Sequence, residues 1–238
     1  MLKAIFFDLD GTLLPLKEDL FIQIYVEGIL KKFIPLGFDK DKLLYFSKKN
    51  IIDMFNNDGS RTNEQIYFDD YKEIFGEYTE KDQMLIDEFY KVEFEETFKA
   101  CGYNPYARKI VEYCKEKGLK VILSTNPVFP KIATTKRMAI TGLKEEDFDY
   151  ITTYDNSRFC KPNPNYFLDL LEKFNLNKDE VIVFGNNTHE DGECANKAGL
   201  KCFIIGDYVI DKKNILNNFA YLKMDEVIKT IEENLKSS

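Results

Sequence analysis

The sequence has no cluster of basic residues. Its 33 Lys and Arg are outnumbered by 41 Asp and Glu, which gives a formal net charge of -8 and a pI of about 5.0. Proteins that bind nucleic acids or anionic membranes carry a basic patch on their surface. We therefore expect neither a nucleic acid nor a membrane as partner.

The chain also lacks a long apolar run. No segment approaches the roughly 20 apolar residues that a membrane-spanning helix needs. The apolar stretch near Met1 is too short for a signal peptide and runs directly into acidic residues. These absences predict a cytoplasmic protein.

Cysteine is scarce and scattered. The five Cys are odd in number and form no C-x-x-C pair, so neither a disulfide framework nor a zinc site is expected. Reduced thiols agree with a cytoplasmic location. A glycine-rich nucleotide loop and a dinucleotide fingerprint are also missing, so nucleotide hydrolysis of that kind is not supported.

What the chain does have is core material and alternating elements. Hydrophobic residues make up 44% of its 238 residues, including 20 Phe, which is enough for one large α/β domain or a core with an inserted unit. Short apolar runs separated by helical patterns predict a Rossmann-like, doubly wound parallel sheet. The predicted strands are residues 4–9, 120–123, 150–153, 181–184 and 202–205. Helices are predicted at residues 130–141, 165–174, 190–198 and 222–235.

The alternation is interrupted between residues 16 and 103. Amphipathic patterns there predict a series of helices. They cover residues 20–34, 42–55, 64–75 and 80–98. We therefore predict an α-helical unit, residues 16–103, inserted into a core made of residues 1–15 and 104–238.

Two acidic residues follow the first predicted strand. Asp8 and Asp10 are two residues apart, which places both carboxylates on one side of an extended chain. Gly11 allows the chain to turn away. Two neighbouring carboxylates repel each other unless a proton or a cation lies between them, and Mg²⁺ prefers such oxygen ligands. The alternative is an ordinary Asp-rich turn in contact with water.

Three further polar groups follow later predicted elements. Thr125 and Asn126 come after the second strand, where hydroxyl and backbone N–H groups can hold phosphate oxygens. Lys161 precedes a proline and a helix start, and Asp191 lies six residues after Gly185, which follows the predicted strand at residues 181–184. Each of these groups also has an ordinary explanation. Thr125 and Asn126 are common turn residues, Lys161 could be an exposed lysine, and Asp191 could be an acid favoured at a helix N-terminus.

Together, and in this order, these motifs resemble the haloacid dehalogenase-like (HAD) hydrolase superfamily. The D-x-D-G-T motif at Asp8 carries most of the resemblance, with T-N at Thr125 and K-P at Lys161 following it. The resemblance implies that Asp8 is a nucleophile that becomes phosphorylated and that Asp10 is the general acid and base. It implies that Thr125, Asn126 and Lys161 hold the phosphoryl oxygens.

The same resemblance implies a Mg²⁺ ion and a cap. The Asp8 side chain, the Asp10 backbone carbonyl and an acid of the last motif, Asp191, would hold the metal. The inserted helices are similar to the cap found between the first two motifs in one branch of the family. The resemblance thus implies a Mg²⁺-dependent phosphatase that acts on a small phosphorylated metabolite. Because dehalogenases of the family lack the second acid, Asp10 argues against dehalogenation.

The last motif departs from the family pattern. Asn186 and Asn187 stand where the family usually has an Asp, and an amide oxygen brings no charge to a metal. Asn187 is the metal-ligand candidate of this pair, with Glu190 and Asp191 nearby. We expect a higher Mg²⁺ requirement than in a relative with Asp there. His189, the single histidine, is expected to be solvated near a helix start.

Three alternatives of other kinds remain at this point. A phosphomutase would use the same phosphorylated aspartate and return the group to a sugar. The amides at 186 and 187 also suit a binding module that has lost activity. A phospho-acceptor signalling domain is disfavoured by the helical insertion.

Arg61, in a polar turn of the inserted helices, is expected to be a surface residue. The sequence identifies neither the substrate nor the oligomeric state.

Overall fold

The computed structural model describes residues 1–236, and within them the chain forms a six-stranded, all-parallel sheet. The strand order is β3-β2-β1-β4-β5-β6. The strands are β1 Ala4–Phe7, β2 Lys120–Leu123, β3 Tyr150–Ile151, β4 Val181–Gly185, β5 Lys201–Ile205 and β6 Ala220–Leu222. The predicted doubly wound α/β fold is therefore confirmed.

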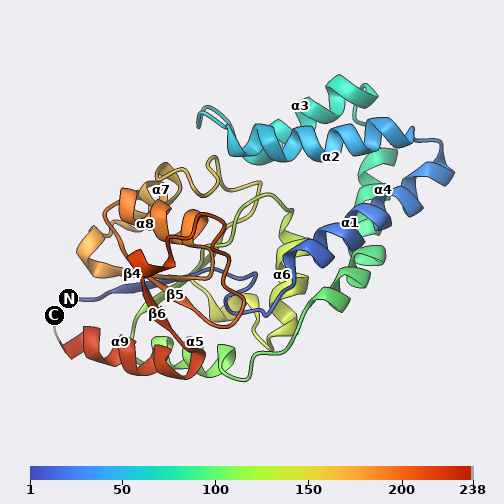
Figure 1. Cartoon of the computed structure of the whole chain (residues 1–238). Coiled ribbons are helices and arrows are strands. Elements are labelled where there is room, and N and C mark those ends of the chain that lie inside the picture. Colours follow the sequence, from blue (N-terminus) through green and yellow to red (C-terminus); the bar gives the residue numbers. More distant parts are fainter. Residues whose placement is uncertain (237–238) are drawn as a thin grey trace.

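Helices cover both faces of the sheet (Figure 1). Alternate residues of each strand point to opposite faces, so Ile5 and Phe7 join one buried cluster while Ala4 and Phe6 join another. The first cluster includes residues of α5, α6 and α9, and the second includes residues of α7 and α8. These helices are α5 Ala107–Glu116, α6 Lys131–Ile140, α7 Asn165–Phe174, α8 Cys194–Lys197 and α9 Val227–Lys236.

Between β1 and β2, the four α-helices that precede α5 extend away from the sheet (Figure 1). They are α1 Glu18–Phe33, α2 Lys40–Phe55, α3 Asn63–Phe75 and α4 Glu80–Lys91. Side-chain caps fix three of the helix starts, with Asp39 before α2 and capping boxes at Thr62 and Thr79 before α3 and α4.

One of the predicted helices was too long. Residues 80–98 were predicted as a single helix, but α4 ends at Lys91 and a 3₁₀ segment, Glu93–Ala100, follows. The buried residues of this segment are Phe94, Thr97 and Ala100, which repeat every third residue. This spacing fits the three residues per turn of a 3₁₀-helix and would spread around an α-helix.

Two further predictions were wrong in detail. The C-terminal helix begins at Val227 and not at residue 222, because Ala220–Leu222 forms the unpredicted edge strand β6. The predicted helix at residues 190–198 is a widely wound π-helical turn, Thr188–Glu193, followed by the short α8. Among residues 1–236, no helix is both long and apolar enough to cross a bilayer.

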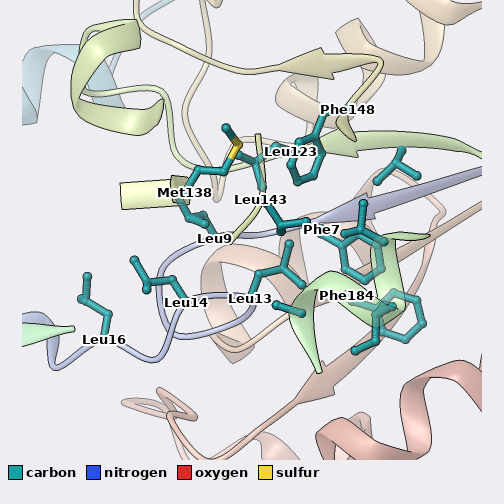
Figure 2. Packing of buried hydrophobic residues seen from close by; sticks show 14 of the residues in the cluster. Phe7, Leu9, Leu13, Leu14, Leu16, Leu123, Met138, Leu143, Phe148 and Phe184 are labelled. Atoms are coloured by element: carbon teal, nitrogen blue, oxygen red, sulfur yellow. The ribbon is translucent and has the colours of Figure 1, made fainter. Parts of the chain in front are cut away.

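The loop that follows β1 is packed into the core. Leu9, Leu13 and Leu14 are fully buried. Figure 2 shows them beside Met138 of α6 and Leu143. The burial of these three leucines fixes the loop that carries Asp8 and Asp10, so both acids are held at a defined place above the sheet.

Candidate active site

Polar residues that follow β1, β2 and β4 meet at one edge of the sheet. β1 pairs with β2 on one side and with β4 on the other. The carboxyl ends of neighbouring parallel strands face the same edge, where ligands of open α/β sheets bind. There Asp8, Thr125 and Asn186 line a cavity of about 590 Å³ together with Lys161 from the loop before α7.

Lys161 lies between two buried carboxylates. Its Nζ donates to Asp8 Oδ1 at 2.8 Å and to Asp191 Oδ1 at 2.6 Å. The second oxygen of Asp8 accepts a hydrogen bond from the Thr12 hydroxyl at 3.0 Å. Because all of these groups are nearly or fully buried, the row of acid, lysine and acid is rigid and shielded from water.

The wide π-helical turn explains why Asp191 reaches Lys161. The N–H groups of Asp191 and Gly192 both donate to the Asn187 carbonyl, at 2.9 and 3.2 Å. Asp191 Oδ2 in turn accepts the backbone N–H groups of Asn186 and Asn187, at 3.1 and 3.0 Å. Both oxygens of Asp191 therefore have hydrogen-bond donors already, which the sequence did not indicate. π-turns of this kind occur frequently at functional sites.

The site carries more negative than positive charge. Burial raises the pKa of Asp8 to about 7, and Asp191 and Asp10 raise it too, whereas Lys161 opposes them. Burial also raises the pKa of Glu190 to about 7. Burial lowers the pKa of Lys161, but Asp191 and Asp8 outweigh this, so its net pKa lies well above the usual value. A proton or a further cation is needed to balance these carboxylates.

Asp10 has a partner that the sequence did not reveal. Arg137 on α6 donates from Nε to Asp10 Oδ1 at 3.0 Å, and its side chain is 1% exposed. The guanidinium group lies over the rings of Phe129 and Phe21, at 4.7 and 5.4 Å from their centroids. Its Nη1 is buried without a hydrogen-bond partner. The ion pair and the two rings hold the Asp10 carboxylate in one place at the cavity.

Thr125 and Asn126 differ in which of their groups form hydrogen bonds with the protein. Thr125 lines the cavity, and its carbonyl is fixed by hydroxyls of Thr152 and Tyr166 at 2.7 and 3.0 Å. Asn126 Oδ1 accepts the N–H of Lys161 at 2.9 Å. Asn126 Nδ2 donates to the Lys161 carbonyl at 3.2 Å and to Glu190 Oε2 at 2.7 Å. Asn126 thus holds the lysine loop against the turn that carries Asp191.

The two amides of the last motif also have separate surroundings. Asn187 Oδ1 caps the π-turn by accepting the N–H groups of His189 and Glu190, at 3.0 and 3.2 Å. Asn186 Oδ1 accepts from the Thr12 hydroxyl at 3.3 Å, and the same hydroxyl donates to Asp8. The oxygen of Asn186 is therefore the one next to Asp8.

His189 and Arg61 are not among the residues that line the cavity. The His189 ring bonds Glu193 and Lys213 near the start of the π-turn. Arg61 is about half exposed and forms an ion pair with Asp69. Neither contact brings these side chains to Asp8.

A known protein family matches this chain. The sequence model of the haloacid dehalogenase-like hydrolases matches residues 2–199, most of the chain. The chain belongs to this family.

Curated relatives of this HAD protein include two kinds of phosphatase. A phosphorylated carbohydrates phosphatase of Thermotoga maritima is 28% identical over 137 residues, which cover 55% of this chain and 60% of that protein. A pyrophosphatase PpaX of Bacillus cereus is 26% identical over 191 residues, which cover 79% of this chain and 76% of that protein.

Solved structures agree on the fold. A HAD phosphatase from Thermococcus onnurineus superposes with a TM-score of 0.59 at 20% identity, covering 97% of this chain and 98% of that chain. A 2-haloacid dehalogenase from Pseudomonas syringae superposes with a TM-score of 0.62 at 18% identity, covering 98% and 99%. At these identities the likeness concerns the fold alone.

The residues around Asp8 suit Mg²⁺, the metal that the family implies. The groups available are carboxylate, amide and carbonyl oxygens, which Mg²⁺ prefers, and buried negative charge is in excess. Within residues 1–236, however, no three His, Cys, Asp or Glu side chains are grouped so that they could hold a metal ion by themselves. A metal here would therefore depend on amide or backbone oxygens, or on the substrate phosphate, for part of its coordination.

Proposed function

We propose that this protein is a Mg²⁺-dependent phosphatase that hydrolyses a small-molecule phosphate monoester through a phosphorylated Asp8. The observation that carries the proposal is the buried Asp8 carboxylate paired with Lys161 at the base of a cavity, beside a second acid held by Arg137. The phosphatase names of the two curated relatives support it.

In the first step, an Asp8 oxygen attacks the phosphorus atom of the substrate. A P–O bond to Asp8 forms while the bond to the alcohol oxygen breaks, and Asp10 gives that oxygen its proton. Thr125 and Lys161 bind the phosphoryl oxygens. In the second step, Asp10 takes a proton from a water molecule that attacks the same phosphorus atom, which releases inorganic phosphate and restores Asp8.

The metal adds charge neutralisation at the phosphoryl group when it is bound. Its ligands would be the Asp8 side chain, the Asp10 backbone carbonyl, Asp191 and an amide of the last motif. Lys161 already occupies one oxygen of Asp8 and one of Asp191. We therefore assign Lys161 the task of holding both acids apart in a fixed geometry as well as binding phosphate.

Asp10 also supports phosphate chemistry over dehalogenation. A phosphate ester releases an alkoxide that needs a proton, whereas a halide leaves without one. A second acid that is fixed by a buried arginine is useful for the first reaction and has no task in the second. The protein is further proposed to act in the cytoplasm, because all five cysteines are free thiols.

The test of this function is phosphate release from a panel of phosphomonoesters and one phosphoanhydride, with and without Mg²⁺. The panel contains alkyl phosphates, glucose 6-phosphate and pyrophosphate. We expect turnover of at least one monoester, lost on chelation with EDTA and restored by millimolar Mg²⁺. Absence of turnover from folded protein, or turnover that EDTA does not change, would contradict the proposal. Accumulation of a sugar bisphosphate would instead indicate a phosphomutase.

The metal requirement should respond to the amides of the last motif. Asn186→Asp adds a charge next to Asp8 and should lower the Mg²⁺ concentration for half-maximal activity by about tenfold, the scale of changes around metal ligands. Asn187→Asp should lower it less, because that side chain caps the π-turn. Both are measured by Mg²⁺ titration of phosphate release. An equal or larger effect at position 187 would mean that Asn187 is the metal ligand, as the sequence predicts, and that Asn186 is not.

A further inference from the structure

The cavity above Asp8 has a polar base and an apolar wall. The wall is formed largely by α1 and α2 of the inserted helices. From α1 come Phe21, Ile22, Tyr25 and Val26, whose spacing of one and four residues places them on one side of the helix. The base consists of the acids, amides and lysine described above. A ligand that places its phosphate at Asp8 therefore extends toward apolar side chains.

α2 adds a second apolar stripe to the wall. The side chains of this stripe are partly exposed, whereas other residues of α2 pack the helix against the protein. Leu44, Ile51 and Ile52 line the cavity and are 38%, 38% and 46% exposed. The neighbouring Leu43 and Met54 are buried and pack the same helix into the rest of the protein. Ser47 and Lys48 lie in the helical turn between Leu44 and the two isoleucines. Exposed aliphatic side chains gathered beside a polar site are nevertheless characteristic of a binding surface.

The polar groups in this wall offer few hydrogen-bond partners or positive charges to a polar ligand. The Ser47 hydroxyl donates to the Leu43 carbonyl of its own helix at 2.9 Å. Glu18 is negatively charged, lies 3.5 Å from Lys212 and would repel a second anionic group. Lys48 is the one cation that α1 and α2, both fully described, add to the wall. A sugar would find few partners for its hydroxyls, and a diphosphate would find a single lysine for its second phosphate.

We propose that the substrate is the phosphate monoester of an apolar alcohol, with a group of about six carbons, aliphatic or aromatic, seated on the stripes of α1 and α2. This inference rests on the proposed phosphatase function. A volume of about 590 Å³ suits a small ligand with room for a phosphate and such a group. The stripes give the carbon chain a surface that excludes water, while Lys161 and Thr125 take the phosphate.

The test compares n-alkyl phosphates from ethyl to n-hexyl with glucose 6-phosphate and pyrophosphate, at saturating Mg²⁺. The alcohols of this alkyl series are similar in acidity, so differences in kcat/KM report how the chain is bound. We expect kcat/KM to rise about two- to fourfold per methylene, the upper value corresponding to a fully buried CH₂. Hexyl phosphate should thus exceed ethyl phosphate by about 15- to 250-fold.

A variant in the stripe provides the second arm. Ile52→Gln, at a half-exposed position, should reduce the hexyl-to-ethyl ratio of kcat/KM by about fivefold or more, because the polar amide disfavours an apolar chain. Met84→Gln is the matched control: Met84 is 71% exposed on α4 and is not among the cavity residues. It should leave the ratio unchanged.

Three outcomes would overturn the inference while leaving the phosphatase function intact. One is a flat alkyl series, and another is a preference for glucose 6-phosphate or pyrophosphate. The third is an equal loss on ethyl and hexyl phosphates in Ile52→Gln, which would mean that the stripe serves closure of the helices on the core. Failure of every phosphate in the panel would instead contradict the function itself.

Discussion

Asp8→Asn should abolish phosphate release and at the same time raise the thermal stability of the metal-free protein. Asparagine has the same shape but cannot act as the nucleophile, so kcat should fall by at least about 10³-fold. The single amide oxygen can accept from Lys161, as Asp8 Oδ1 does, while the Thr12 hydroxyl keeps Asn186 Oδ1 as an acceptor, so the loop stays in place. Phosphate release with Mg²⁺ measures the first effect.

The stability effect follows from the raised pKa of Asp8. Its pKa is about 7 in the folded protein, mainly through burial, against an ordinary value of 3.8. The unfolded chain therefore releases the proton first, so stability is present at low pH and falls as the pH rises from about 4 through about 7. The asparagine variant does not lose this stability with rising pH, because its side chain does not titrate. Its melting temperature in EDTA should exceed that of the natural protein at pH 8 and approach it at lower pH.

Asp179→Asn serves as the control for this substitution. Asp179 is exposed in the 3₁₀ turn before β4, whereas the site residues follow the other end of that strand, so neither activity nor the pH profile of melting should change. Measurable turnover by Asp8→Asn above about one thousandth of the natural rate would exclude Asp8 as nucleophile. If the difference in melting temperature between Asp8→Asn and the natural protein does not vary between pH 5 and 8, the explanation from the raised pKa of Asp8 is refuted.

The main strands and the order of the motifs were predictable from local patterns. A continuous apolar run such as Val181–Gly185 has few alternatives to a buried parallel strand. The edge strand β6 has only three residues, two of them exposed, so it leaves no such run in the sequence. Its position depends on pairing with β5, which is a tertiary contact.

The parts of the site that were not predicted also depend on tertiary contacts. Arg137 lies 127 positions from Asp10, and nothing in the pattern of α6 distinguishes it from a surface arginine. Asp191 was predicted as a metal ligand, but its bonds to Lys161 and to two backbone N–H groups depend on a π-turn that helical periodicity does not reveal. Motifs indicate which residues gather; the packing decides which atoms each of them contacts.

Lys161→Met should abolish activity and, in contrast to Asp8→Asn, strongly destabilise the protein. Methionine fills a similar volume, but the carboxylates of Asp8 and Asp191 would remain buried without their cation. Breaking a buried ion pair from one side costs about 3–5 kcal/mol, which corresponds to a fall in melting temperature of about 6–20 °C for a chain of this size. Thermal denaturation and phosphate release measure the two effects, and Lys109→Met on the exposed side of α5 is the control.

The double variant Asp8→Asn with Lys161→Met separates charge from packing. If the loss in Lys161→Met arises from unpaired negative charge, removing one of the two acids should recover about 0.5–3 kcal/mol of it, the range for residues in direct contact. Asp191 keeps part of the penalty, because its Oδ1 still lacks the lysine. Strictly additive effects, or a melting temperature of Lys161→Met within about 2 °C of the natural protein, would show that the ion pair does not hold the site together. The opposite signs expected for the two single variants thus come from one cause, a site with more buried acid than its single lysine can balance.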